Sequence, residues 1–195
     1  MKALLPLLLF VAVACGGPSG SGRPTVHYIA VDRSASARDK AEPFFELAIA
    51  EHERALANSG DRVEIYAFDD GVSEVYVGPP KGEEGGIAPA LRAIKTREGR
   101  RGTNVGKLVA RIEERMKVNA ADDARVLVLT DCGTETMTGA EAKRAKEIST
   151  RWAADPKVTS FEVVGPDAGL IDDLRRVWDH AAKQARLRPW PDRCR

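Results

Sequence analysis

A carboxylate and two hydroxyls follow the first apolar run of the predicted domain. The run Thr25–Val31 is predicted to form a buried strand, and Asp32, Ser34 and Ser36 come directly after it at alternate positions. All three side chains offer hard oxygen atoms, which suit Mg²⁺ or Mn²⁺ better than zinc or copper. This chemistry leaves two interpretations open, a metal-assisted binding surface and a nucleophilic enzyme site.

Two further polar stretches lie where predicted strands and helices meet. Gly102-Thr103-Asn104 opens a predicted helix, and Thr130-Asp131 ends the strand that follows it. If that strand pairs beside the first one, the chain turns in opposite directions on leaving the two strands, and a crevice opens at their carboxyl ends. The side chains expected to converge there are Asp32, Ser34, Ser36, Thr103 and Asp131.

Strand and helix patterns alternate along the chain from residue 23 onward. Alternating or continuous apolar runs predict strands at residues 26–31, 63–68, 72–77, 126–129 and 158–164. Apolar residues at helical spacing predict helices over residues 45–56, 87–94, 105–116, 142–152 and 170–181. This order predicts a three-layer, doubly wound (Rossmann-like) α/β fold. Its sheet is expected to be mostly parallel, with one antiparallel edge strand after the hairpin signal at Asp69–Gly71.

Capping signals mark the beginnings of two of these helices. Asp39 and Glu42 resemble the two ends of a capping box for the first helix. Thr138 and Glu141 form the same signal for the helix that follows the fourth strand. The buried face of the first helix is expected to carry Phe45, Ile49, His52 and Leu56.

The overall charge of the chain is close to balanced. Its 195 residues include 30 Lys and Arg against 29 Asp and Glu, for a formal net charge of +1. Aromatic residues make up 6%, too few for the stacking platform with which proteins hold single-stranded nucleic acid. We therefore expect no nucleic-acid partner.

The N-terminus carries a targeting signal. Lys2 precedes an apolar run from Ala3 to Ala14, which has the length of a secretory signal and is too short to span a bilayer. The residues before Cys15 resemble the lipobox of bacterial lipoproteins, although Ala12 stands where Leu is usual. The resemblance implies that Cys15 is lipidated and that the protein is anchored in the bacterial cell envelope, facing the periplasm or in the outer membrane. Ordinary signal cleavage, with Cys15 as a bystander, is the alternative.

A single folded domain is expected after this signal, since no internal repeat or second domain is visible. A Gly-rich and Ser-rich stretch would join the domain to the membrane as a flexible linker. The expected parts are a signal peptide (1–15), a linker (16–23), the domain (24–185) and a C-terminal tail (186–195).

Two cysteines remain if Cys15 carries lipid. Cys132 and Cys194 would share an oxidising compartment, where a disulfide can form between them. Their spacing leaves open whether they pair, because the distance between their Cα atoms decides it. Neither has a second Cys or a His at zinc-ligand spacing.

The chain resembles the von Willebrand factor A domain between about residues 23 and 185. That family has a metal-ion-dependent adhesion site built from an Asp-x-Ser-x-Ser stretch, then a Thr, then an Asp. Asp32, Ser34 and Ser36 match the first stretch, and Thr103 and Asp131 match the rest in the right order. The resemblance implies that Ser34, Ser36 and Thr103 contact Mg²⁺ (or Mn²⁺ or Ca²⁺), while Asp32 and Asp131 act largely through water. It also implies a partner protein that completes the coordination with an Asp or Glu carboxylate.

Two local features bear on this resemblance. Cys132 follows Asp131 where the family more often has Gly, and its bulkier side chain could narrow the site. Arg97, Arg100 and Arg101 lie just before Thr103. They would favour an acidic partner if they face the metal, and are otherwise part of a solvated loop.

Other functions fit the residues less well. A Mg²⁺-dependent phosphatase could use Asp32 as its nucleophile, but haloacid-dehalogenase-like enzymes carry a second acid two residues later, where this chain has Ser34. A serine hydrolase would need a Gly-x-Ser-x-Gly elbow, and dinucleotide binding a Gly-x-Gly-x-x-Gly stretch after the first strand. Neither is present. We therefore expect a binding module and no enzyme, with a metal-free structural domain of the envelope as the main rival.

Overall fold

The computed structural model describes residues 22–81, 87–96, 99, 102–131, 136–165 and 186–188. Within these residues, no helix is both long and apolar enough to cross a membrane. Several predicted features lie outside them and stay predictions. They are the signal peptide with Cys15, the helix at 170–181, and the side chains of Cys132, Cys194, Arg97, Arg100 and Arg101.

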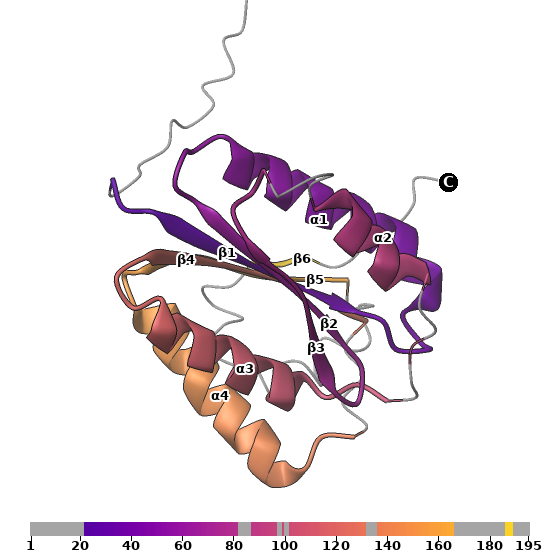
Figure 1. Cartoon of the computed structure of the whole chain (residues 1–195). Helices are drawn as coiled ribbons and strands as arrows, with labels where there is room; N and C mark the ends of the chain where they lie inside the picture. Colours follow the sequence, from indigo (N-terminus) through magenta and orange to yellow (C-terminus); the bar gives the residue numbers. More distant parts are fainter. Residues whose placement is uncertain are drawn as a thin grey trace, which may run out of the picture.

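A six-stranded sheet forms the middle of the molecule, with the strand order β3-β2-β1-β4-β5-β6 (Figure 1). β1 pairs in parallel with both β2 and β4, so it lies at the centre. β2 and β3 form the one antiparallel pair among the described strands, at the edge of the sheet. The strands are Thr25–Asp32 (β1), Arg62–Phe68 (β2), Val72–Gly78 (β3), Asp123–Leu129 (β4), Val158–Val164 (β5) and Arg186–Arg188 (β6).

Helices cover both faces of this sheet (Figure 1). α1 and α2 pack on one face, and α3 and α4 pack on the other, which gives three layers. The predicted doubly wound α/β fold, with a mostly parallel sheet, is therefore confirmed. The helices are Ala41–Leu56 (α1), Ala88–Thr96 (α2), Val105–Val118 (α3) and Gly139–Ala154 (α4), and a 3-10 turn, η1, spans Arg38–Lys40.

Alternate residues of β1 enter the two halves of the core. Tyr28 and Ala30 pack with α3 and α4, whereas Ile29 and Val31 pack with α1 and α2. All four side chains are buried. Side chains alternate across a strand, so a central strand that is covered on both faces is apolar at nearly every position. This explains the continuous apolar run that predicted β1.

The beginning of α1 differs from the prediction. η1 precedes the helix, α1 begins at Ala41, and no side chain caps it, so the capping box predicted from Asp39 and Glu42 is wrong. The residue at the N-cap, Lys40, already has nearly helical angles (φ −98°, ψ 0°), whereas a capping side chain needs an extended backbone there. The capping box of Thr138 and Glu141 is confirmed, because Thr138 is extended and both of its hydrogen bonds form.

The buried face of α1 is also rotated from the predicted one. Phe45 and Ile49 lie at its partly buried margin, and Leu56 is 39% exposed. The rotation brings a charged residue, Glu51, into the interior, which an apolar pattern cannot anticipate. The fully buried positions of the helix are Phe44, Ala48, Glu51 and Ala55.

Glu51 belongs to a buried cluster of charged residues near the amino end of β1. The two ring nitrogens of His27 lie 2.8 Å from Glu51 Oε1 and 3.1 Å from Asp61 Oδ2. Arg125 Nε on β4 donates to the same oxygen of Glu51 at 2.9 Å. Burial of charge is tolerated when it is paired in this way, so partners on two strands allow Glu51 to face the sheet.

Acid is expected to weaken the fold through two buried carboxylates. Burial alone would raise the pKa of Glu51, but the hydrogen bond from His27 and the positive charge of Arg125 outweigh it and hold this pKa below its ordinary value. Three hydrogen bonds lower the pKa of Glu64 in β2 in the same way. Stability from a lowered Glu pKa is complete above the ordinary value of about 4.3 and is lost below it. Urea unfolding should show the free energy of unfolding falling between about pH 4.5 and pH 3, and a constant value would contradict this.

Candidate metal centre

Asp32 is the last residue of β1 and lies in the interior, where its side chain is held from two directions. Its Oδ1 accepts a hydrogen bond from the Ser34 backbone N–H at 2.8 Å. Its Oδ2 accepts one from the Thr130 hydroxyl at 2.6 Å. Asp32 is 3% exposed, so its carboxylate has a fixed position at the carboxyl end of the central strand.

The two serines lie side by side in the loop after β1. Ser34 is buried and Ser36 is exposed, and their hydroxyl oxygens are 3.1 Å apart. Because hydroxyl groups can rotate, each can turn a lone pair toward a cation and its hydrogen away from it. The loop therefore presents the predicted pair of neutral oxygen donors next to the Asp32 carboxylate.

Thr103 is fully buried, and its hydroxyl has no hydrogen-bond partner in the described part of the chain. The loop that holds it has a fixed shape, because Gly102 has a φ of +91° and Asn104 caps α3 by accepting from the Lys107 N–H. Buried polar atoms are nearly always paired, and each exception needs an explanation. A cation at this position would supply the missing partner.

Backbone hydrogen bonds bring the Thr103 loop to the end of β1. The Arg33 N–H donates to the Phe68 carbonyl at 2.9 Å, which extends the pairing of β1 with β2. The Asn104 N–H donates to the carbonyl of the next residue, Asp69, at 2.7 Å. Thr103 and the residues after β1 are therefore attached to the same end of β2.

Asp131 lies just beyond β4 and is 6% exposed. Burial raises the pKa of Asp32 to about 6, and the negative charge of Asp131 adds to this effect. The hydrogen bonds from Thr130 and Ser34 oppose it. A buried carboxylate whose ionisation is made costly by burial and by a neighbouring negative charge favours the presence of a cation, because the cation's charge compensates it.

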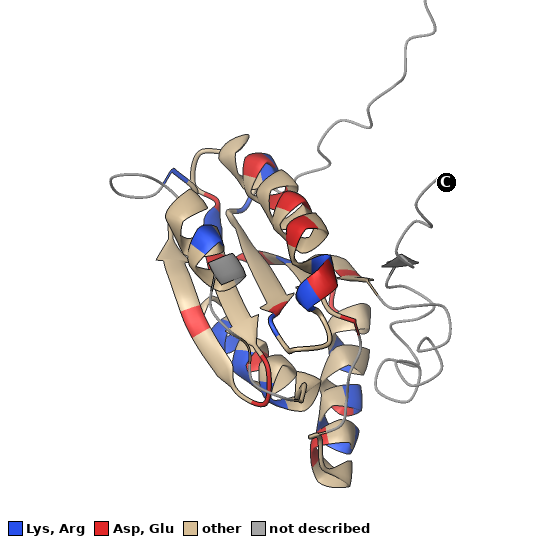
Figure 2. Cartoon of the chain, turned by 90° about the vertical axis from the view of Figure 1, so that its right-hand side faces the viewer, with Lys and Arg blue, Asp and Glu red and all other residues tan. Residues whose placement is uncertain are grey.

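The donor set fits Mg²⁺ better than zinc. The structure brings Asp32, Ser34 and Ser36 together and attaches Thr103 and Asp131 to the same edge, which gives hydroxyl and carboxylate oxygens only. Among the described residues, no group of three or more His, Cys, Asp or Glu side chains is arranged to hold a metal. Figure 2 views the side of the molecule on which this edge lies, and the Lys and Arg positions there are mixed with Asp and Glu. A site of oxygen donors is what Mg²⁺, Mn²⁺ or Ca²⁺ requires.

Residues 28–134 match the family model of the von Willebrand factor type A domain. The chain belongs to this family. No curated protein matches the chain significantly. The matched segment includes β1 from Tyr28 onward, all of β4 and every residue of the candidate metal centre.

Solved structures show the same fold as this type A domain. A von Willebrand factor type A protein from Catenulispora acidiphila has 20% identity and a TM-score of 0.56, over 80% of this chain and 37% of that one. The D319A mutant of the PilB minor pilin from Streptococcus sanguinis has 8% identity and a TM-score of 0.66, over 90% of this chain and 59% of that one. The conserved hypothetical protein BatB from Bacteroides thetaiotaomicron has 16% identity and a TM-score of 0.50, over 73% of this chain and 67% of that one. This chain therefore spans little more than a third of the first of these proteins.

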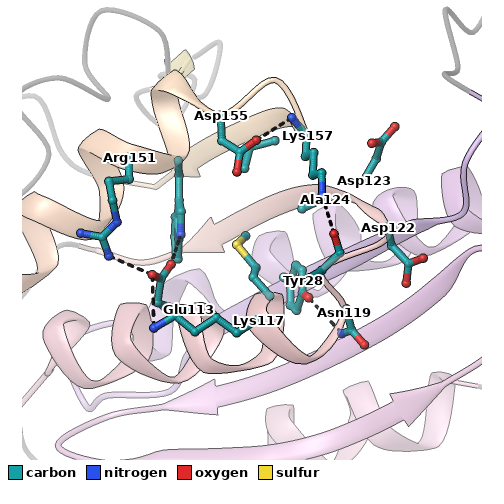
Figure 3. Close-up of a pocket in the computed structure, with 14 residues that line it drawn as sticks. Tyr28, Glu113, Lys117, Asn119, Asp122, Asp123, Ala124, Arg151, Asp155 and Lys157 are labelled. Carbon is teal, nitrogen blue, oxygen red and sulfur yellow. Dashed lines mark hydrogen bonds and ion pairs between the residues drawn. The ribbon is translucent and has the colours of Figure 1, made fainter.

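A separate cavity of about 250 Å³ lies at the opposite edge of the type A domain, near the amino ends of β4 and β5 (Figure 3). The charged groups at its centre already have partners within the protein. Glu113 accepts hydrogen bonds from Arg151 at 2.8 Å and from the Trp152 indole at 2.7 Å, and Lys117 lies 3.7 Å from it. Since these groups need no ligand, the carboxyl edge remains the candidate site.

Sequence reasoning missed two residues that support the metal centre. Thr130 stands next to a predicted ligand, but nothing in its type or spacing predicts the hydrogen bond to Asp32. Asp69 was predicted only as part of a hairpin turn. Both reach the site through the pairing of β1 with its neighbours, so the one available signal was their position at a strand end.

Proposed function

We propose that this type A domain binds a partner protein through a divalent cation at the carboxyl edge of its sheet. The observation that carries the proposal is the buried Thr103 hydroxyl, which has no hydrogen-bond partner among the described residues. Its loop is attached to the end of the sheet at which two carboxylates and two serine hydroxyls lie. Asp32, Ser34, Ser36, Thr103 and Asp131 would hold the ion, as in the adhesion site that the family resemblance implies.

The ligand types support a bridging role for the ion. Neutral hydroxyls compensate the charge of a dication poorly, so the ion stays electrophilic. Mg²⁺ takes octahedral oxygen coordination and keeps several waters when it binds to protein. One of these waters can be replaced by an Asp or Glu carboxylate of the partner. Mn²⁺ or Ca²⁺ would serve if the loops adjust to their size.

The direction of β1 suits a protein that is anchored by its N-terminus. β1 has eight residues and runs from Thr25 to Asp32, so the metal edge lies roughly 25 Å from the point where the linker joins. If Cys15 is lipidated, as its sequence context predicts, this geometry lets the metal edge face away from the membrane. The similarity to a minor pilin is in line with a location at the cell envelope.

The arrangement of Asp32 favours binding over phosphoryl transfer. A nucleophilic carboxylate needs an accessible oxygen, whereas Asp32 is buried and both of its oxygens accept hydrogen bonds. Ser34 occupies the position at which a haloacid-dehalogenase-like enzyme has its second acid. We therefore propose a binding role without turnover.

Metal and partner binding can be tested together with the full-length protein in detergent. Isothermal titration calorimetry with Mg²⁺ should give saturable binding. Asp131→Asn should lower the Mg²⁺ affinity about tenfold, because it removes a negative charge that would compensate the charge of the ion. Capture of a partner from solubilised envelope should require Mg²⁺ and should be lost in EDTA and in Asp131→Asn. Asp155→Asn, which changes an exposed carboxylate at the opposite edge, should behave as the unchanged protein does.

Two results would count against this proposal. Partner capture that persists unchanged in EDTA would favour the metal-free structural role. Steady phosphatase turnover with Mg²⁺ that disappears in Asp32→Asn would favour the enzyme.

A further inference from the structure

The carboxylate of Asp69 is buried next to the loop that follows β1, and Asp69 belongs to neither candidate ligand stretch. Asp69 directly follows β2, whose last residue, Phe68, pairs with Asp32. It is 1% exposed, and its Oδ2 accepts a hydrogen bond from Arg33 Nε at 3.0 Å. Arg33 stands between the candidate ligands Asp32 and Ser34. The Asp69 side chain is thus bonded to the first ligand loop.

The backbone of Asp69 reaches the second ligand loop. Its carbonyl accepts the Asn104 N–H at 2.7 Å, and Asn104 directly follows Thr103. A tight turn fixes the direction of this carbonyl, because Asp69 Oδ1 accepts from the Gly71 N–H at 3.0 Å and the Asp69 N–H donates to the Gly71 carbonyl at 2.9 Å. One residue therefore connects the loop of the two serines with the loop of Thr103.

We propose that Asp69 is a positioning residue that sets the distance between these two ligand loops. The inference rests on the proposed function, since it concerns the affinity of the same site for its ion. Neutral hydroxyl ligands attract a cation less strongly than carboxylates do. Their contribution to metal affinity therefore depends on the fold holding them at the right distance from one another. Substituting a residue that orients metal ligands without touching the metal typically lowers the metal affinity about 10–100-fold.

Two substitutions separate positioning from plain electrostatics. Asp69→Asn removes a negative charge near the ion, and Arg33→Gln removes a positive one. By Coulomb's law alone, the first would weaken Mg²⁺ binding and the second would strengthen it. If the contact positions the loops, both variants lose about tenfold in Mg²⁺ affinity, and the double variant loses little more than either single one.

The other end of β2 offers a matched control. Asp61 is also buried, accepts a backbone N–H from Thr25 at 2.9 Å and faces the ring of His27 at 3.1 Å. Asp61→Asn should destabilise the protein as Asp69→Asn does, but it lies at the edge opposite the ion. Its Mg²⁺ affinity should match that of the unchanged protein.

The readouts are Mg²⁺ affinity by titration and hydrogen exchange of the Asn104 amide in the metal-free protein. We expect Asp69→Asn to weaken binding and to speed exchange at Asn104, and Asp61→Asn to do neither. Tighter Mg²⁺ binding by Arg33→Gln would overturn the positioning role of Asp69 but not the proposed function. Unchanged Mg²⁺ affinity and unchanged hydrogen exchange at Asn104 in Asp69→Asn would do the same. Failure of the unchanged protein to bind Mg²⁺ would instead overturn the proposed function.

Discussion

Replacing Thr103 with Val should make the metal-free protein more stable and its metal site inactive. Within the described part of the chain, the buried Thr103 hydroxyl has no hydrogen-bond partner, and such a group costs about 1–3 kcal/mol. Val has nearly the same shape, so Thr103→Val should raise the free energy of unfolding in EDTA by about 1–2 kcal/mol. Thr103 is a proposed direct ligand, so the same change should lower Mg²⁺ affinity by about 100-fold. Urea unfolding and Mg²⁺ titration measure the two effects.

Thr130→Val is the matched control, because its hydroxyl is equally buried but donates to Asp32 at 2.6 Å. Removing that bond leaves a carboxylate oxygen without its donor and should lower the free energy of unfolding by about 1–3 kcal/mol. The two Thr→Val variants should thus have opposite effects on stability. A loss of stability in Thr103→Val would mean that its hydroxyl is already satisfied, and the main argument for a cation would fall.

Glu64→Ala should destabilise the fold by about 3–5 kcal/mol, because it breaks a buried ion pair from one side. Glu64 is fully buried in β2 and binds the guanidinium of Arg115 through both oxygens, at 2.9 and 2.8 Å. It also accepts hydrogen bonds from the Tyr66 hydroxyl at 2.6 Å and from the Asn119 amide at 2.9 Å. The substitution removes the acceptor of all of these hydrogen bonds. Chemical unfolding would measure the resulting loss in the free energy of unfolding.

A second Glu–Arg pair between the sheet and α3 provides the comparison. Glu74 on β3 lies 3.2 Å from Arg111, and both side chains are about two-fifths exposed. Solvent-exposed pairs contribute about 0–1 kcal/mol, so Glu74→Ala should have little effect. Equal decreases in the free energy of unfolding for Glu64→Ala and Glu74→Ala would show that burial does not determine the strength of these ion pairs. Neither substitution should change Mg²⁺ affinity.

The layers of the fold could be predicted because they depend on local patterns. The continuous apolar runs of β1 and β4 predict central strands, and the helical spacing of apolar residues predicts α3 and α4. Asn104 and Thr138 mark helix beginnings because capping involves residues only a few positions apart. Glu51 shows where this reasoning fails. Its burial depends on His27 and Arg125, which come from distant strands, and no pattern within α1 contains that information.

By itself, the sequence determined which chemical groups reach the candidate metal centre. Asp32, Ser34 and Ser36 come at or after the end of one strand, Thr103 comes just before the helix α3, and Asp131 follows the next parallel strand. Their order along an alternating α/β chain was enough to predict oxygen donors at one edge.

Only the tertiary structure decided how these donors are held and which of them needs a partner. Thr130 is bonded to Asp32, Asp69 connects the two candidate ligand loops, and the buried Thr103 hydroxyl has no partner among the residues that the structure describes. The reason is that a residue's type fixes what it can donate or accept, whereas burial and the distance to groups far along the chain fix what it does. The Thr103 hydroxyl is a candidate metal ligand because the fold buries it with no other partner among the described residues.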